Sequence, residues 1–173
     1  MSVFARLLRP RPDPRETLRP LWHRIVAVSR GERWYREGGV ADNVAGRFDM
    51  IATMLALVLL RLERAGAAAE PQVFLTELFV EDMDRQLRET GVGDLVVGKK
   101  LGKLVSVLGG RLGAYRDALE EGAGEEALVA AVDRNITLAE AREPASLAAM
   151  LRDYDRQLEV LSADTILAAE LPE

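Results

Sequence analysis

The run from Met50 to Leu60 limits most strongly what this chain can fold into, because it contains no charged residue. A helix at the surface of a protein has one apolar stripe and one polar face, whereas this run is apolar on every side. It is also far shorter than the roughly 18 apolar residues that a membrane span requires. We therefore expect a helix buried in the middle of a bundle, which reaches the surface near Arg47 and Asp49 and again at Arg61.

The remaining sequence predicts further helices around this central one. Pro14 and Pro20 each suit the start of a helix, and apolar residues recur at spacings of three and four in the later segments. A chain of 173 residues can form one domain with a sizeable core. The predicted fold is all-α, a single-domain bundle of about six or seven helices. A basic N-terminal arm is expected at residues 1–13 and the helical domain at 14–173.

The segment from Phe74 to Leu119 predicts two helices joined at Gly91 and Gly93, since glycine readily ends a helix. On the second helix, the apolar arc comprises Leu101, Leu104, Val105, Leu108, Leu112, Tyr115 and Leu119. The basic residues expected roughly opposite to this arc are Lys99, Lys100, Lys103 and Arg111. Between these two sets the helical periodicity places a row of small residues, namely Gly102, Ser106, Gly109 and Gly113.

This row of small residues is unusual because each glycine inside a helix costs up to about 1 kcal/mol relative to alanine. Several glycines along one line indicate that another backbone comes close to the helix there. One interpretation is a tightly packed neighbouring helix of the same chain, and the other is a helix of a partner. The candidate partner-binding residues are Trp34, Tyr35, Lys99, Lys100, Gly102, Lys103, Ser106, Gly109 and Gly113.

Two further features have alternative interpretations. Trp34 and Tyr35 lie beside a glycine pair, where they either form an exposed interface contact or anchor a loop onto the core. Asp82 falls inside the apolar stripe of its predicted helix, and an unpaired carboxylate there would be costly. We expect it to form a structural ion pair with Arg47 or Arg111.

The composition argues against an enzyme. The chain has no cysteine and one histidine, His23, with no nucleophile pattern near it. The run GDLVVGKK has the glycine and lysine spacing of a phosphate-binding loop, but it has Lys100 where Ser or Thr would bind Mg²⁺. We therefore expect no catalytic residue, cofactor or metal site.

The charges are distributed unevenly along a chain of net charge −5. Residues 1–36 hold nine arginines and three acids, whereas residues 117–173 hold fourteen acids and four arginines. A basic N-terminal arm can bind an acidic partner, an anionic membrane surface or nucleic acid. It can equally fold back on the acidic C-terminal helices of its own chain.

Two stretches resemble a known family. The runs GGVADNVAGRFDMIATMLALVLLRL and DMDRQLRETGVGDLVVGKKLGKL are similar to the ubiquinol–cytochrome c chaperone family, and the likeness covers roughly Trp22 to Leu128. The phrase GVGDLVVGK after DMD is its most specific part. The resemblance implies an all-helical assembly factor of the respiratory bc1 complex (complex III) without a catalytic centre.

The family also implies partners. Its mitochondrial members bind newly made cytochrome b, work with a small partner protein and act near the ribosome. This chain lacks their long N-terminal extension, so we expect a bacterial-type member in the cytoplasm, with peripheral contact at the inner face of the membrane. The predicted function is a non-enzymatic assembly chaperone for cytochrome b or an early bc1 intermediate. The alternative is a ribosome- or RNA-associated or general helical interaction module, and no DNA partner is expected.

Overall fold

The computed structural model describes the backbone of residues 13–89 and 94–173, and the side chains of residues 13–86 and 102–173. Its elements are η1 (Pro14–Leu18), α2 (Arg19–Ser29), α3 (Glu32–Arg36), α4 (Val44–Arg64), α5 (Ala69–Glu89), α6 (Asp94–Leu119), α7 (Glu125–Asn135), α8 (Pro144–Glu159) and α9 (Ala163–Leu167). Over these residues the only β-type pairing is an isolated bridge between Val40 and Leu138. The expected all-α, single-domain bundle is therefore confirmed.

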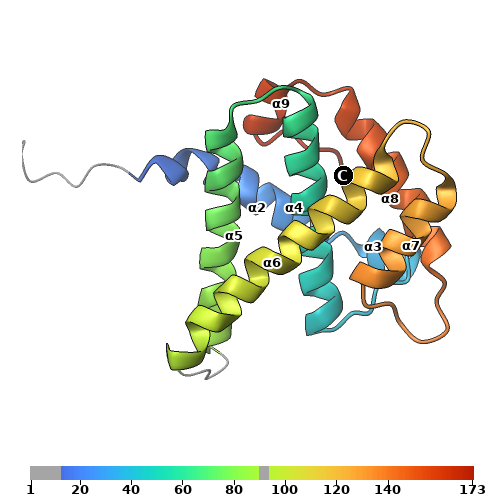
Figure 1. Cartoon of the computed structure of the whole chain (residues 1–173), viewed down its shortest axis with the longest axis horizontal. Coiled ribbons are helices and arrows are strands. Elements are labelled where there is room, and N and C mark those ends of the chain that lie inside the picture. Colours follow the sequence, from blue (N-terminus) through green and yellow to red (C-terminus); the bar gives the residue numbers. More distant parts are fainter. Residues whose placement is uncertain (1–12, 90–93) are drawn as a thin grey trace, which may run out of the picture.

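Helix α4 runs through the middle of the bundle (Figure 1). Helix α5 lies beside it, α6 crosses both diagonally, and α7 and α8 cover the opposite side. The ends of α5 and α6 that meet near residues 90–93 project from the rest of the molecule. These two helices therefore form a hairpin that extends beyond the rest of the bundle.

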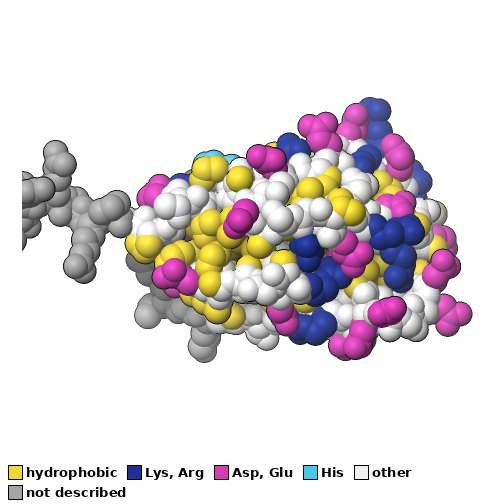
Figure 2. Space-filling view, turned by 90° about the horizontal axis from the view of Figure 1, so that it is seen from above, with side chains coloured by type: hydrophobic (Ala, Val, Ile, Leu, Met, Phe, Trp, Pro, Cys, Tyr) yellow, Lys and Arg dark blue, Asp and Glu magenta, His cyan; other side chains and the backbone are white. Residues whose placement is uncertain are grey.

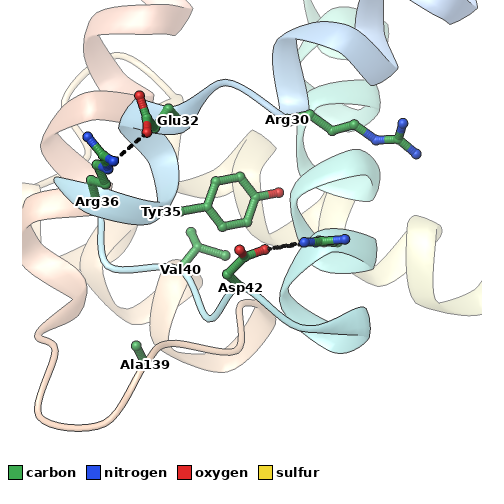
Figure 3. Close-up of a pocket in the computed structure, with 8 residues that line it drawn as sticks. Arg30, Glu32, Tyr35, Arg36, Val40, Asp42 and Ala139 are labelled. Carbon is green, nitrogen blue, oxygen red and sulfur yellow. Dashed lines mark hydrogen bonds and ion pairs between the residues drawn. The ribbon is translucent and has the colours of Figure 1, made fainter.

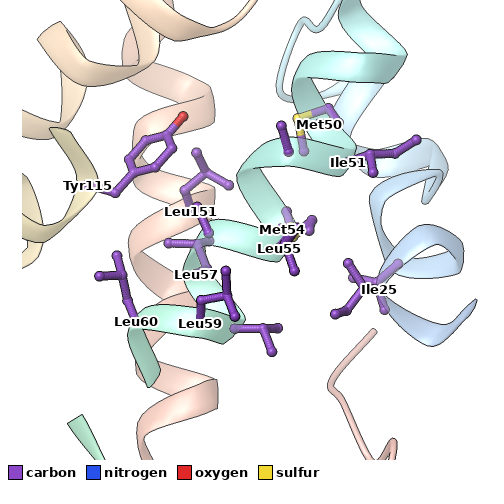
Figure 4. Packing of buried hydrophobic residues seen from close by; sticks show 14 of the residues in the cluster. Ile25, Met50, Ile51, Met54, Leu55, Leu57, Leu59, Leu60, Tyr115 and Leu151 are labelled. Atoms are coloured by element: carbon purple, nitrogen blue, oxygen red, sulfur yellow. The ribbon is translucent and has the colours of Figure 1, made fainter. Parts of the chain in front are cut away.

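The core is built around α4, as its sequence predicts. Every residue from Met50 to Leu60 is buried. Side chains from several other helices pack around this run, including Ile25 of α2, Tyr115 of α6 and Leu151 of α8 (Figure 4). No helix in the described parts of the chain combines the length and hydropathy needed to cross a bilayer.

Local contacts fix the start of α4. The Asn43 side chain caps the helix by accepting a hydrogen bond from the Gly46 amide at 2.9 Å. The backbone before this cap pairs with the loop after α7, where the Ala41 amide donates to the Thr137 carbonyl at 2.9 Å. Gly46 is required here, because a Cβ at this position would lie 2.1 Å from the Ala41 carbonyl oxygen.

The described part of the basic N-terminal region contacts two regions of the fold. Arg15 and Arg19 form ion pairs with Glu81 of α5 at 3.2 and 3.4 Å. Arg24 donates to the Leu171 carbonyl near the C-terminus at 2.8 Å. The arm predicted at residues 1–13 lies, apart from Asp13, outside the described residues.

Candidate protein-binding face

Helix α6 has one buried face and one open face. Leu108, Arg111, Tyr115 and Ala118 are buried, at spacings of three and four residues. On the other side, Gly102, Ser106 and Gly109 are exposed and Gly113 is partly exposed. We call Gly102, Ser106, Gly109, Gly110 and Gly113 the α6 glycine face.

Nothing in the described chain packs onto this face. A Cβ placed on Gly102, Gly109, Gly110 or Gly113 would meet no atom of a neighbouring element within 4 Å. Among the described residues, no neighbouring helix of the same chain contacts Gly102, Gly109 or Gly113, so that interpretation of the predicted row is wrong for these three positions. Their small size has no explanation in the packing of the described domain.

A shallow groove runs along the outer surface of the hairpin between α5 and α6. It consists of two adjoining hollows of about 350 and 400 Å³ that share Thr76 and Glu77. Its apolar lining residues are Leu59, Ala69, Val73, Val80, Val105 and Leu112, and its charged ones are Arg15, Glu63, Glu77, Glu81 and Asp84. We call this surface the α5–α6 groove.

The apolar lining of the groove is partly open to solvent. Val73 and Val105 are 51% and 48% exposed. Figure 2 shows hydrophobic side chains gathered at the left of the view, where Figure 1 places α5, with acidic side chains among them. Lys and Arg side chains are more frequent in the middle and at the right. Val105 and Leu112, two positions of the predicted apolar arc of α6, line the groove.

The structure describes two side chains of the basic cluster predicted on α6, Lys103 and Arg111. Lys103 is exposed, whereas the side chains of Lys99 and Lys100 lie outside the described residues. Arg111 does not belong to this cluster, because its side chain is buried. The prediction that it lies opposite to the apolar arc is wrong for this residue.

Arg111 instead binds Asp49 of α4. Its guanidinium donates to the Asp49 carboxylate and, at 2.7 Å, to the Asn135 carbonyl. The other carboxylate oxygen of Asp49 accepts from the amide and hydroxyl of Thr137 at 2.9 and 2.7 Å. This buried network links α4, α6 and the loop after α7, and it fixes which face of α6 points outward.

The prediction that Asp82 forms an ion pair with Arg47 or Arg111 is wrong. Asp82 pairs with Arg85, three residues further along α5, and also accepts from Gln86. Arg47, the other predicted partner, pairs with Asp42 at 2.7 Å. Side chains three and four residues apart on a helix are neighbours, so Asp82 needs no partner from another helix.

Trp34 anchors the loop after α2 and is not an exposed contact. It is 1% exposed, and its indole N–H donates to the Val28 carbonyl at 2.8 Å. Its ring packs edge-to-face against Tyr154 with centroids 5.8 Å apart. Of the two interpretations offered by the sequence, the structure supports the anchor.

Tyr35 is half-buried and lines an open hollow of about 840 Å³ (Figure 3). Its hydroxyl donates to the Ser29 carbonyl at 3.1 Å, and burial raises its pKa. Two arginines of this hollow are neutralised locally, since Arg36 pairs with Glu32 and Arg47 with Asp42. Within the described residues, no group of three or more His, Cys, Asp or Glu side chains is arranged to hold a metal ion.

Sequence reasoning missed two features. The groove depends on how α5 and α6 cross, which no spacing in the sequence specifies. The expectation that α4 reaches the surface near Asp49 is wrong, because the Asp49 side chain is buried and binds Arg111.

Comparison with known proteins supports the family. The family model for ubiquinol-cytochrome C chaperones matches residues 36–171. The crystal structure of the Cbp3 homolog from Brucella abortus superposes with a TM-score of 0.77 at 30% identity, covering 90% of this chain and 87% of that chain. The search of curated proteins gave no match. The chain therefore belongs to the ubiquinol-cytochrome c chaperone family.

Proposed function

We propose that this chain is a non-enzymatic assembly chaperone that binds newly made cytochrome b or an early bc1 assembly intermediate through the α6 glycine face. Family membership supports the chaperone role. The observation that supports the site is the open space in front of Gly102, Gly109 and Gly113.

The chemistry of this face suits an apolar helix of a membrane-protein client. Small residues four apart, such as Gly109 and Gly113, allow two helix backbones to approach closely. The adjoining Val105 and Leu112 supply apolar surface, and Lys103 adds a positive charge at the edge. Such a client, before insertion, exposes apolar helices that need temporary cover.

The proposed setting follows from the same chemistry. A chaperone for a membrane protein works where the client enters the bilayer, so we place this one in the cytoplasm with peripheral contact at the inner face of the membrane. A small helical partner protein is a further candidate for the same face.

Photo-crosslinking in the native cell tests this proposal. A photoreactive amino acid replaces exposed Ser106, and a matched control replaces exposed Ala130 on α7. We expect cytochrome b or another bc1 subunit to be crosslinked from position 106 and not from 130. Ribosomal or unrelated proteins at position 106, without bc1 subunits, would contradict the proposed client.

A further inference from the structure

The C-terminal end of α6 carries acids that its own helix disfavours. Asp117 lies in the last turn of α6, and Glu120 and Glu121 follow the helix directly. The C-terminal end of a helix has a partial negative charge, so acids are unfavourable there. Glu125 and Glu126 differ, because they occupy the first turn of α7, where a negative charge is favourable. We call Asp117, Glu120 and Glu121 the α6 acids.

The α6 acids are open to a partner. All three are exposed, and no ion pair or side-chain hydrogen bond links them to any part of the chain that the structure describes. The arginine beside them, Arg116, pairs with Glu63 of α4 at 2.7 Å. The described domain therefore supplies no cation to these acids.

The α6 acids continue the α6 glycine face at one end. Gly110 and Asp117 are seven residues apart, roughly two helical turns, so they point in nearly the same direction. Gly113 and Glu120 have the same spacing. At the other end of the face lies Lys103, which is exposed and seven residues before Gly110. The open side of α6 thus runs from a cation through small residues to acids, and its two ends differ in charge.

The length of this open side matches part of a membrane-spanning helix. Figure 1 shows α6 crossing in front of α4 and α5, with the loop after α6 at the edge of the molecule. From Gly102 to Gly113 the glycine face extends roughly 16 Å at 1.5 Å per residue. A membrane span of about 20 residues is roughly 30 Å long. The face therefore covers about half of one span, and one end of that span lies beside the α6 acids.

The two ends of a membrane-spanning helix also differ in charge, because loops on the cytoplasmic side are enriched in Lys and Arg. We propose that the α6 acids bind the basic flank of the client helix whose apolar part lies on the α6 glycine face. The basic end of the client lies at Asp117 and its other end points toward Lys103. Binding thus selects apolar helices with a basic end and fixes their direction. This inference rests on the proposed function, since it names the charge and direction of the client at the same site.

Two synthetic peptides test the inference with the full chain. Both contain an apolar helix of about 14 alanine and leucine residues, and one ends in lysines where the other ends in glutamines. Fluorescence anisotropy measures the two affinities at low salt. We expect the lysine peptide to bind about fivefold more tightly, since several exposed ion pairs each contribute a little. Added salt should remove the difference, because it screens exposed charges.

Two triple variants separate the α6 acids from the net charge of the protein. The first neutralises the α6 acids with the substitutions Asp117→Asn, Glu120→Gln and Glu121→Gln. The control neutralises three exposed acids outside α6 with the substitutions Glu140→Gln, Glu143→Gln and Glu170→Gln. The first variant should fold, since it removes unfavourable charges from a helix end, and it should lose the preference for lysine. The control should keep the preference, and equal losses in the two variants would overturn the inference.

A spin label on the lysine end of the peptide tests the direction of binding. The amide signals of Asp117 and Glu120 should broaden more than the amide signal of Lys103, because the labelled end lies beside the α6 acids. Stronger broadening at Lys103 would overturn the inference.

The inference and the proposed function can fail separately. If the wild type binds both peptides equally and Gly109→Leu abolishes this binding, the α6 acids do not recognise the basic flank, and the client site stands. If Gly109→Leu leaves the binding of both peptides unchanged, the site on the α6 glycine face is contradicted and the inference with it.

Discussion

The two faces of α6 carry opposite kinds of residue. The buried face has Leu108, Arg111 and Tyr115, each held by contacts with other helices. The open face has glycines that touch no other described element. The packing of the fold explains the residues of the buried face. The glycines of the open face lower helix propensity, and no packing contact within the described domain compensates for this. This difference is the reason for the proposed binding of a partner at the open face.

The largest effect is expected on the buried face, for Arg111→Ala. The substitution leaves the buried Asp49 carboxylate without its cation, which typically costs about 3–5 kcal/mol of unfolding free energy. Urea denaturation measures the loss. Lys103→Ala, at an exposed position of the same helix, is the control and should change stability by less than about 0.5 kcal/mol. Equal effects of the two variants would contradict the assignment of the buried face.

Gly46 of α4 provides a contrast to the glycines of α6, because a glycine that the fold requires should not tolerate alanine. The Cβ of Gly46→Ala would lie 2.1 Å from the Ala41 carbonyl oxygen. Overpacking of this kind costs about 1–3 kcal/mol, and a rigid backbone neighbour favours the upper end. A shift of the urea midpoint to lower concentration is the expected result, and an unchanged midpoint would contradict it.

Tyr115 gives the buried face a pH dependence. Burial, opposed in part by the hydrogen bond with Thr53, raises its pKa from 10.0 to about 12. Between these two values the unfolded chain has lost the phenol proton that the native protein keeps. The free energy of unfolding therefore falls as the pH rises, by up to about 2–3 kcal/mol for this group.

Urea denaturation of the wild type and Tyr115→Phe between neutral pH and pH 11 measures this contribution. We expect a shallower decline in the variant. Tyr154, whose pKa is also raised to about 12 by burial, remains and keeps part of the slope. Identical slopes in both proteins would show that Tyr115 is not protected from ionisation.

The smallest effect is expected on the open face and has the opposite sign. Gly109→Ala adds a methyl group where no neighbouring element lies within 4 Å. Alanine is the better helix former, so unfolding should become about 0.5–1 kcal/mol less favourable. A loss of stability in urea denaturation would mean that the glycine is needed by the fold after all.

The sequence predicts the fold well and the site incompletely. The uncharged run of α4 predicts a buried central helix, and the spacings of three and four in the other segments predict the all-α class. Trp34 was ambiguous because an aromatic residue beside a glycine elbow can face either way. The predicted ion pair between Asp82 and Arg111 is wrong because helical periodicity shows where side chains point around one helix axis. It does not show how two helices cross. The groove depends on that crossing and required the structure.

The most direct test of the open face is client capture by Gly109→Leu. A Cβ at this position meets no described atom of a neighbouring element within 4 Å, and leucine is a better helix former than glycine, so stability should be unchanged or higher. Cytochrome b recovered with the tagged protein should fall about tenfold, equivalent to about 1.4 kcal/mol of binding. Ala130→Leu on the exposed side of α7 should recover the wild-type amount. Wild-type recovery by a folded Gly109→Leu protein would contradict a client site on this face.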